Sequence, residues 1–473
     1  GWVEDDAAVL IYDKYDMWKF NTETGEAQNI TDGFGRQNAL TFRIYKLNKE
    51  KEFFRTKETV LLSAFHNFRK YTRIYSLELN TGYLKELVDE DKMYTIRSKA
   101  KKSDKILFTK ETYNEFPDLR ISDLKLNNQK KLTSLDKQRE KFSWGNAELI
   151  EWNSIDGLPL QGVVIKPDNF EEDKTYPVLV YYYRFFSQRI HEFNDMVINH
   201  RPNFAYYVSN GYVVFLPDIR FEIGRPGYSA TKCLVPGVQK LIEQGIAKPD
   251  GIALHGHSWS GYQTAFVVTQ TDIFACAVAG APVSNMTSAY SGIRWGSGLA
   301  RQFQYEKSQS RIGVSLFENP MPYIENSPVF YADKINTPLL IQHGDVDEAV
   351  PWYQSIELYL AMRRLGKDCI FLHYKDEPHH LKKYPNKLDY SIKMKEFIDH
   401  HLKQFAADIM GIFDPNVSLV ITQSWLNATE PQQFFPVHNH CNSIISGVFY
   451  PKCLEFPGDK LDRIFLHRDE QNS

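Results

Sequence analysis

The segment that most constrains the fold lies at residues 256–262 and reads Gly-His-Ser-Trp-Ser-Gly-Tyr. An apolar run at 252–254 precedes it, and a helical pattern of apolar residues follows it. A strand that turns sharply into a helix around a serine is the nucleophile elbow of α/β-hydrolases. In that elbow, a strained turn exposes the hydroxyl at the carboxyl edge of a parallel sheet. The pattern therefore predicts that Ser258 is a nucleophile.

Two later segments carry the groups that would activate such a serine. A buried strand is predicted at 337–342, and a turn-rich loop with several carboxylates follows it. Another strand, at 369–374, leads into a loop that contains adjacent histidines. In this fold the acid and then the histidine follow the serine in chain order, and functional groups lie just past the carboxyl ends of strands. We therefore expect a Ser-Asp-His set at one edge of the sheet.

Residues 256–397 resemble the prolyl oligopeptidase family of serine peptidases. Its members carry Gly-x-Ser-x-Gly-Gly, then His-Gly-x-x-Asp-x-x-Val, then a late Glu-x-His, and this chain has corresponding motifs in that order. The resemblance implies that Ser258 is the nucleophile, Asp347 the acid and His379 the base. In that arrangement the histidine takes the serine proton, and the aspartate stabilises the imidazolium that forms.

Three positions near these motifs need a separate interpretation. Asp345 occupies a variable place in its loop, and His380 stands where the family usually has glycine, so neither is assigned to the triad. Ser260 replaces the family's first glycine after the nucleophile, whereas Gly261 keeps the second. Glycine is favoured at such turns because the backbone is strained. A serine adds one small group, and we expect the elbow to accommodate it.

The oxyanion of the tetrahedral intermediate needs two preorganised donors. In this fold one is the backbone N–H after the nucleophile, here that of Trp259. The resemblance implies a tyrosine hydroxyl as the other, and its spacing selects Tyr183 from the run 177–183. Strand alternation puts Tyr181 on the same face and Tyr182 on the opposite face, which makes Tyr182 the weaker substitute.

The resemblance also implies that residues 280–286 help to line the pocket for the side chain before the scissile bond. Val283 and Met286 would make that pocket apolar. Proline-specific members have an aromatic ring near the place of Met286, so strict cleavage after proline is not expected. Ordinary core packing is the alternative role of both side chains, because apolar residues are most often buried.

Composition narrows the possible partners without naming one. The 473 residues include 56 Lys and Arg against 59 Asp and Glu, and the net charge of −3 favours neither nucleic acid nor an acidic tail. No apolar run reaches the roughly 18 residues of a membrane span. Five scattered cysteines form no disulfide framework and leave the compartment open between cytoplasm and periplasm or secretion. Histidines such as His191, His200 and His373 show no metal-ligand spacing, and neither a metal nor a cofactor is expected.

Residues 1–150 read as β-rich, with a strand-turn-strand pattern repeated at 17–31, 74–88 and 119–133. This spacing is typical of propeller blades, and about three blades fit, fewer than the roughly four to eight of a closed ring. Because the resembled family carries a propeller before its hydrolase domain, we expect a partial all-β propeller here. The start at Gly1, without initiator Met or signal peptide, then indicates a chain truncated at its start.

Residues 151–405 alternate strand and helix, which predicts the α/β-hydrolase domain with a mostly parallel sheet covered on both faces. Strands are predicted at 162–166, 178–183, 212–216, 252–255, 275–279, 339–342 and 370–374. Helices are predicted at 230–244, 261–269, 353–364 and 390–403.

Residues 406–473 form a tail outside the hydrolase. The segment 425–450 resembles part of an Fe(II)/2-oxoglutarate oxygenase family, in which two histidines and a carboxylate hold the iron. His438 and His440 could supply two ligands, but a third is missing and His467 is a poor substitute. A gene fusion, or an assembly error that joins two frames, explains the tail better than a working metal site.

The predicted function is that of a serine peptidase that cleaves short peptides. Three alternatives stay open: an esterase or other acyl hydrolase on the same triad, a binding protein whose hydrolase domain has decayed, and an oxygenase defined by the tail.

Overall fold

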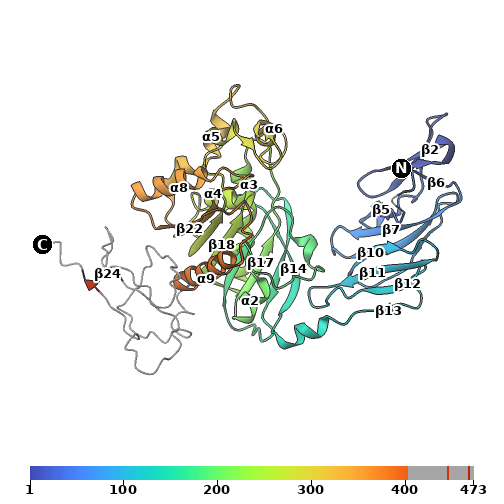
Figure 1. Cartoon of the computed structure of the whole chain (residues 1–473), viewed down its shortest axis with the longest axis horizontal. Coiled ribbons are helices and arrows are strands. Elements are labelled where there is room, and N and C mark those ends of the chain that lie inside the picture. The colour runs from blue at the N-terminus through green and yellow to red at the C-terminus, as the bar shows by residue number, and fades with distance from the viewer. Residues whose placement is uncertain (49, 403–444, 447–466, 469–473) are drawn as a thin grey trace. The chain divides into compact units, whose positions relative to one another are not determined.

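The computed structural model describes residues 1–48, 50–402, 445–446 and 467–468 (Figure 1). The chain divides into two compact units, Gly1–Ile412 and Phe413–Ser473. In the second unit the described residues are the paired strands β24 (Ile445–Ser446) and β25 (His467–Arg468). His438 and His440 lie outside the described residues, so the oxygenase resemblance of the tail stays a prediction.

Three antiparallel meanders of four strands make up the first part of the chain. The first consists of β1 (Trp2–Val3), β2 (Ala8–Tyr12), β3 (Met17–Asn21) and β4 (Ala27–Asn29). The second consists of β5 (Leu40–Ile44), β7 (Thr59–His66), β8 (Thr72–Glu78) and β9 (Leu84–Glu86). The third consists of β10 (Met93–Lys99), β11 (Lys105–Glu111), β12 (Arg120–Asp123) and β13 (Lys130–Lys131).

The meanders are joined into two sheets. The short strand β6 (Phe53–Phe54) pairs with β1, and one bridge between Thr72 and Met93 joins the second and third meanders into an eight-stranded sheet. The sequence repeats coincide with the third strand of each meander and the turn into the fourth. The predicted β-rich character is thus confirmed, whereas the propeller stays a prediction.

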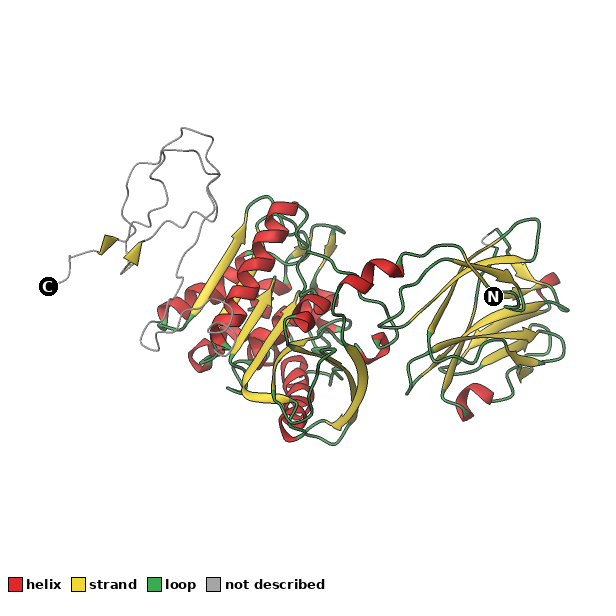
Figure 2. Cartoon of the chain, turned by 90° about the horizontal axis from the view of Figure 1, so that it is seen from below, coloured by secondary structure: helices red, strands yellow, loops and turns green. Residues whose placement is uncertain are grey.

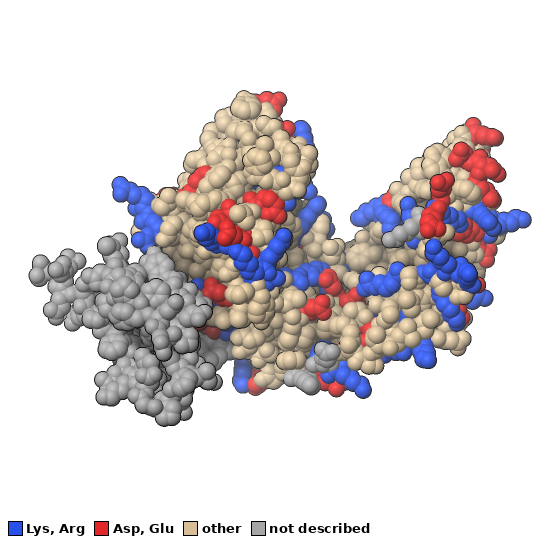
Figure 3. All heavy atoms as spheres, viewed as in Figure 1, with Lys and Arg blue, Asp and Glu red and all other residues tan. Residues whose placement is uncertain are grey.

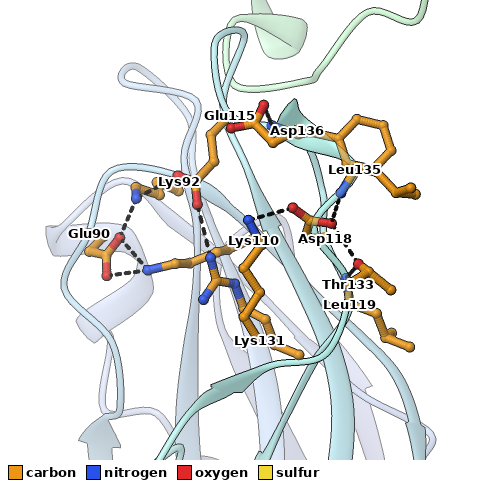
Figure 4. A network of polar contacts seen from close by, with 12 residues as sticks. Glu90, Lys92, Lys110, Glu115, Asp118, Leu119, Lys131, Thr133, Leu135 and Asp136 are labelled. Atoms are coloured by element: carbon orange, nitrogen blue, oxygen red, sulfur yellow. Dashed lines mark hydrogen bonds and ion pairs between the residues drawn. The ribbon is translucent and has the colours of Figure 1, made fainter. Parts of the chain in front are cut away.

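A buried aspartate closes the third meander (Figure 4). Asp118 accepts hydrogen bonds from the Thr133 hydroxyl at 2.6 Å and from the Leu135 N–H at 2.9 Å, and Lys131 Nζ lies 2.6 Å from it. The Leu119 N–H in turn donates to the Thr133 hydroxyl. These contacts compensate a carboxylate that is 1% exposed, and they fix the end of β13 against the start of β12.

The first meander repeats this arrangement. There Asp16 accepts hydrogen bonds from the Thr31 hydroxyl at 2.7 Å and from the Gly35 N–H at 2.8 Å. The Met17 N–H donates to the Thr31 hydroxyl, as the Leu119 N–H does to Thr133. The repeat seen in the sequence is therefore also a repeat of polar contacts.

An eight-stranded sheet forms the centre of the following domain, in the order β14-β15-β17-β16-β18-β19-β22-β23 (Figure 2). β14 and β15 are antiparallel to their neighbours, and the remaining strands are parallel to one another. The strands are β14 (Asn146–Asn153), β15 (Pro159–Lys166), β16 (Tyr176–Tyr181), β17 (Val213–Pro217), β18 (Ala247–His257), β19 (Cys276–Gly280), β22 (Leu339–Gly344) and β23 (Cys369–Tyr374).

Helices cover both faces of this sheet (Figures 1 and 2). The longer ones are α3 (Pro226–Glu243), α4 (Trp259–Val267), α8 (Tyr353–Arg364) and α9 (Tyr384–His401). The shorter ones are α1 (Phe34–Gln37) in the β-rich part, α2 (Phe204–Ser209), α5 (Met286–Tyr290), α6 (Gln302–Glu306) and α7 (Met321–Glu325). A small hairpin, β20 (Ile293–Arg294) and β21 (Leu299–Ala300), precedes α6.

Strand alternation decides which side chains meet which helices. On β16, Val178 and Val180 join the core beneath α3, α4 and α8, whereas Leu179 and Tyr181 join the core beneath α2 and α9. Because both faces are buried, central strands such as β17 and β19 are apolar and buried along their whole length. This arrangement confirms the α/β-hydrolase fold class.

The predicted elements are all present, with shifted ends. The strand expected at 178–183 ends at Tyr181, and the helices expected from 230 and 390 begin at Pro226 and Tyr384. The helices α2, α5, α6 and α7 were not predicted, because five or six residues are too few for a helical apolar pattern. The division expected at residue 150 falls within β14 and stays a prediction.

Positive and negative side chains are interspersed on the visible face of the described residues (Figure 3). Among these residues no helix combines the length and apolar character needed to cross a membrane.

Candidate active site

Ser258 lies in a strained turn between β18 and α4. Its φ of 62° and ψ of −120° lie in a region that residues other than glycine rarely adopt. A Cβ on Gly256 would lie 2.2 Å from the Ser260 carbonyl oxygen, and one on Gly261 would lie 2.2 Å from the Gly280 carbonyl oxygen. The two glycines therefore permit the close backbone approach that a nucleophile elbow requires.

The serine at position 260 fits into this turn. Its side chain is fully buried, and its hydroxyl accepts from the His257 N–H and donates to the His257 carbonyl oxygen, both at 2.9 Å. Because the added polar group has a donor and an acceptor, it carries no unpaired hydrogen-bonding cost. The departure from glycine thus has a structural explanation.

Ser258, His379 and Asp347 form one hydrogen-bonded chain. His379 Nε2 lies 2.8 Å from Ser258 Oγ, and His379 Nδ1 lies 2.7 Å from Asp347 Oδ2. The Asp347 carboxylate can only accept while it is ionised, so Nδ1 carries the proton and Nε2 is free to accept from the serine. This tautomer is the one that a general base next to a serine needs.

The Asp347 carboxylate is held in place by its own loop. Its Oδ1 accepts hydrogen bonds from the Ala349 N–H at 2.7 Å and the Val350 N–H at 2.8 Å. Burial raises the pKa of this carboxyl, but the hydrogen bonds from His343 and His379 outweigh burial and hold the pKa below its usual range. The group therefore stays ionised near neutral pH.

His343 also contacts the Asp347 carboxylate, a role that the sequence motif did not indicate. Its ring is completely buried, with Nε2 3.0 Å from Asp347 Oδ2 and 3.1 Å from the Val350 carbonyl oxygen. Both neighbours are acceptors, so Nε2 carries the proton, and Nδ1 accepts from the Ser355 hydroxyl at 2.7 Å. His343 and His379 therefore share the same oxygen of the carboxylate, and His343 helps to hold it in place.

Asp345 and His380, which were not assigned to the triad from the sequence, lie outside this chain of hydrogen bonds. Asp345 accepts from the Asp376 N–H at 2.6 Å and lies 3.5 Å from His373. His380 is exposed, and its ring packs near those of His200 and His257.

Of the three consecutive tyrosines, Tyr183 is the one beside the serine. Its hydroxyl accepts from Gln309 Nε2 at 3.0 Å. Burial raises the pKa of Tyr183, and this effect outweighs the lowering by hydrogen bonds with Ser258 and Gln309, so the phenol keeps its proton. Tyr182 instead bonds to Thr264 on the opposite face at 3.0 Å, and Tyr181 packs in a core cluster.

The second expected donor is the backbone N–H of Trp259. Trp259 is the first residue of α4, and the first N–H groups of a helix have no intrahelical partner. Trp259 and Tyr183 both line the small pocket that contains Ser258.

That pocket is largely polar, in contrast to the apolar pocket expected from the sequence. Its lining consists of Tyr183, Ser258, Trp259, Val283, Arg294, Arg301, Gln304, Tyr305, Gln309, Ser310 and Val350. Val283 belongs to this lining, whereas Met286 is fully buried in an adjacent apolar cluster. The two arginines were not identified from the sequence, because they follow the predicted segment in a long connection without regular periodicity.

Arg301 is a buried cation without a carboxylate partner among the described residues. Its side chain is 1% exposed. Its guanidinium donates to the Ala349 carbonyl oxygen and, at 2.9 Å, to the Tyr305 hydroxyl, while Nε has no partner. The lining of the pocket therefore contains two guanidinium groups and no carboxylate among the described residues.

Comparisons with known proteins agree with this geometry. The model of the prolyl oligopeptidase family matches residues 199–405. The chain is 25% identical over 277 residues to the uncharacterized peptidase YuxL of Bacillus subtilis, an alignment that covers 54% of this chain and 39% of that protein. It is 31% identical over 150 residues to dipeptidyl aminopeptidase BIII of Pseudoxanthomonas mexicana, which covers 31% of this chain and 21% of that protein.

Two solved structures share the fold. An acylaminoacyl peptidase of Pyrococcus horikoshii has a TM-score of 0.59 at 19% identity, over 85% of this chain and 63% of that one. A dipeptidyl peptidase 4 of Porphyromonas gingivalis has a TM-score of 0.63 at 16% identity, over 83% of this chain and 54% of that one. The chain thus spans less than two thirds of the length of each of these relatives.

A serine on a strained elbow, at the carboxyl edge of a mostly parallel sheet, defines the domain as an α/β-hydrolase. Within that class, residues 199–405 belong to the prolyl oligopeptidase family, as the sequence motifs predicted.

A comparison of Asp347 with the nearby Asp345 tests which aspartate acts with His379. We expect Asp347→Asn to slow the reaction of Ser258 with a fluorophosphonate by several orders of magnitude, because the amide no longer fixes the tautomer of His379 or stabilises its imidazolium. Asp345→Asn removes a carboxylate outside the hydrogen-bonded chain and should change the rate less than tenfold (~1.4 kcal/mol). Second-order labelling rates measure both; a larger loss in Asp345→Asn would contradict the assignment.

Proposed function

We propose that this protein is a serine peptidase that hydrolyses peptide bonds of short peptides. The observation that supports this function most strongly is the hydrogen-bonded chain from Ser258 through His379 to Asp347. The family of residues 199–405 and the names of the relatives, which are peptidases, favour an amide over an ester substrate.

The first step forms an acyl-enzyme. Ser258 Oγ attacks the carbonyl carbon while His379 Nε2 takes the hydroxyl proton, and the imidazolium is stabilised by Asp347. Collapse of the tetrahedral intermediate breaks the C–N bond, and His379 delivers its proton to the leaving amine. A water molecule then repeats the sequence on the ester, which releases the acid and restores the Ser258 hydroxyl.

The Trp259 N–H and the Tyr183 hydroxyl are the proposed oxyanion donors. Both residues line the pocket that contains Ser258. A donor aimed at this developing charge is worth about 100- to 1000-fold in turnover. The raised pKa of Tyr183 serves this role, because the phenol must stay protonated to donate.

The domain organisation is part of the proposal. Residues 1–150 would be a partial propeller of three meanders, residues 151–405 the peptidase domain, and residues 406–473 a tail without a role in hydrolysis. The catalytic groups, the oxyanion donors and the pocket all lie between Tyr183 and His379.

The pocket further favours substrates with an acidic residue before the scissile bond. Arg294 and Arg301 both line it, and none of its lining residues is acidic. Guanidinium groups bind carboxylates through strong, charge-assisted hydrogen bonds. A glutamate side chain that enters the pocket would therefore interact with the guanidinium groups of Arg294 and Arg301.

Peptide hydrolysis tests the main proposal. The wild-type protein should release the chromophore from short peptide p-nitroanilides, and Ser258→Ala should lose this activity while its circular dichroism spectrum is unchanged. A parallel panel of simple esters separates the alternatives. Fast ester cleavage without peptide cleavage would favour an esterase, and no turnover of either would favour a decayed hydrolase domain.

The pocket charge can be tested with an isosteric substrate pair. We expect kcat/KM for a glutamyl substrate to exceed that for the glutaminyl one by at least about tenfold, since a charged hydrogen bond contributes roughly 1.5–3 kcal/mol. In Arg294→Gln the ratio of the two kcat/KM values should fall to about threefold or less, which corresponds to a difference in activation free energy of ~0.7 kcal/mol. Arg363→Gln, on α8 outside the pocket, is the control. An unchanged ratio in Arg294→Gln would show that Arg294 does not select the side chain.

A further inference from the structure

Three histidines from distant parts of the chain meet beside the triad. His200 lies in the connection before α2, His257 ends β18 next to Ser258, and His380 follows His379. One ring nitrogen from each lies within 4.8 Å of the others. Among the described residues this is the one group of three or more histidine, cysteine, aspartate or glutamate side chains with that spacing.

The rings face one another without hydrogen bonds that would explain their position. Ring centroids are 4.3 Å apart for His200 and His257, and 4.1 Å apart for His200 and His380. His257 is 3% exposed, yet neither of its ring nitrogens has a partner, and Nδ1 of His200 also has none. Burial of a polar group without a hydrogen-bond partner is unfavourable. These nitrogens are therefore available to bind a ligand.

The pKa values of the three imidazoles favour their neutral form. Burial, and next the neighbouring His380, lower the pKa of His200 to about 3. Burial also lowers the pKa of His257 far below its usual range, and that of His380 less strongly. Metals bind the lone pair of neutral imidazole, so these histidines do not have to lose a proton to bind one at neutral pH.

We propose that His200, His257 and His380 bind one divalent transition-metal ion of the Zn²⁺ class, and that the bound ion slows acylation of Ser258. Imidazole is a preferred ligand of Zn²⁺, and three histidines with an open fourth position form a known type of zinc site. Zn–N bonds of about 2.0–2.1 Å require the three nitrogens to move closer together. His380 is exposed and His200 half-buried, so these two rings can close on the fixed ring of His257.

The effect on acylation follows from the position of the site. The His379 ring centroid is 4.9 Å from that of His257 and 4.8 Å from that of His380. His379 gains positive charge in the transition state of acylation. A nearby divalent cation repels that charge, so it raises the barrier. This second part rests on the proposed function, whereas metal binding does not.

Binding is measured on the full chain after treatment with a chelator. Titration with Co²⁺ should give one equivalent of tightly bound ion with visible d–d absorption, and Zn²⁺ should displace it. Removal of a residue that only hydrogen-bonds to a metal ligand lowers metal affinity by about 10- to 100-fold. Removal of a ligand itself, in His380→Asn or His200→Asn, should therefore lower the affinity by at least about 100-fold. The control is His400→Asn, an exposed histidine at the end of α9, which should bind like wild type.

The fluorophosphonate labelling rate then tests the effect on Ser258. Saturating Zn²⁺ should slow labelling of wild type and of His400→Asn, and chelator should restore the rate. His380→Asn should not respond to the same Zn²⁺ concentration, while its metal-free labelling shows that the variant is folded.

Unchanged Co²⁺ affinity in both ligand variants, or no Co²⁺ binding by wild type, would overturn the site. Tight binding that depends on these histidines but leaves the labelling rate unaltered would overturn only the inhibitory effect. If no preparation reacts with the fluorophosphonate, the proposed function fails, and the Co²⁺ titration still decides the metal site.

Discussion

The buried carboxylate of Asp347 is the group on which the geometry of the site depends. A buried charge is stable only when it is well compensated, and here four donors surround it: two backbone N–H groups and the rings of His343 and His379. The backbone donors fold the loop after β22 around the carboxylate. The same loop presents the Ala349 carbonyl oxygen to Arg301, so one loop supports both the hydrogen-bonded chain and the pocket beside Ser258.

The strained turn at Ser258 likewise depends on the elements that pack around it. Such a backbone conformation persists only where neighbouring structure holds it, and here α4 lies so close to β18 and β19 that side chains at Gly256 and Gly261 would overlap backbone oxygens. Ser260 strengthens the turn through its two hydrogen bonds with His257. The position of Ser258 is thus fixed by packing among three consecutive elements, β18, α4 and β19.

Much of this site could be predicted from the sequence, because its main groups follow short local patterns. The elbow, the strand ends and the order of Ser258, Asp347 and His379 are all local signals. Strand alternation favoured Tyr183 over Tyr182. In the structure Tyr182 bonds to Thr264 on the other face. Helices of five or six residues escaped prediction for lack of periodicity, as did the exact ends of the longer helices.

Groups brought together by long-range packing could not be predicted in this way. Nothing in the sequence joins His200 with His257 and His380, because spacing along the chain does not show which strand ends and connections meet. The polar pocket was missed for a related reason. Met286 turns into an apolar cluster, and Arg294 and Arg301 reach the site from a hairpin and connection that carry no catalytic motif.

The central claim is that Ser258 is an activated nucleophile. The most direct measurement is the intact mass of the protein after reaction with a fluorophosphonate, followed by peptide mapping of the adduct. We expect one phosphonyl group per chain, located on Ser258, with none on the neighbouring Ser260. An adduct on another residue, or an unmodified chain from folded protein, would contradict it.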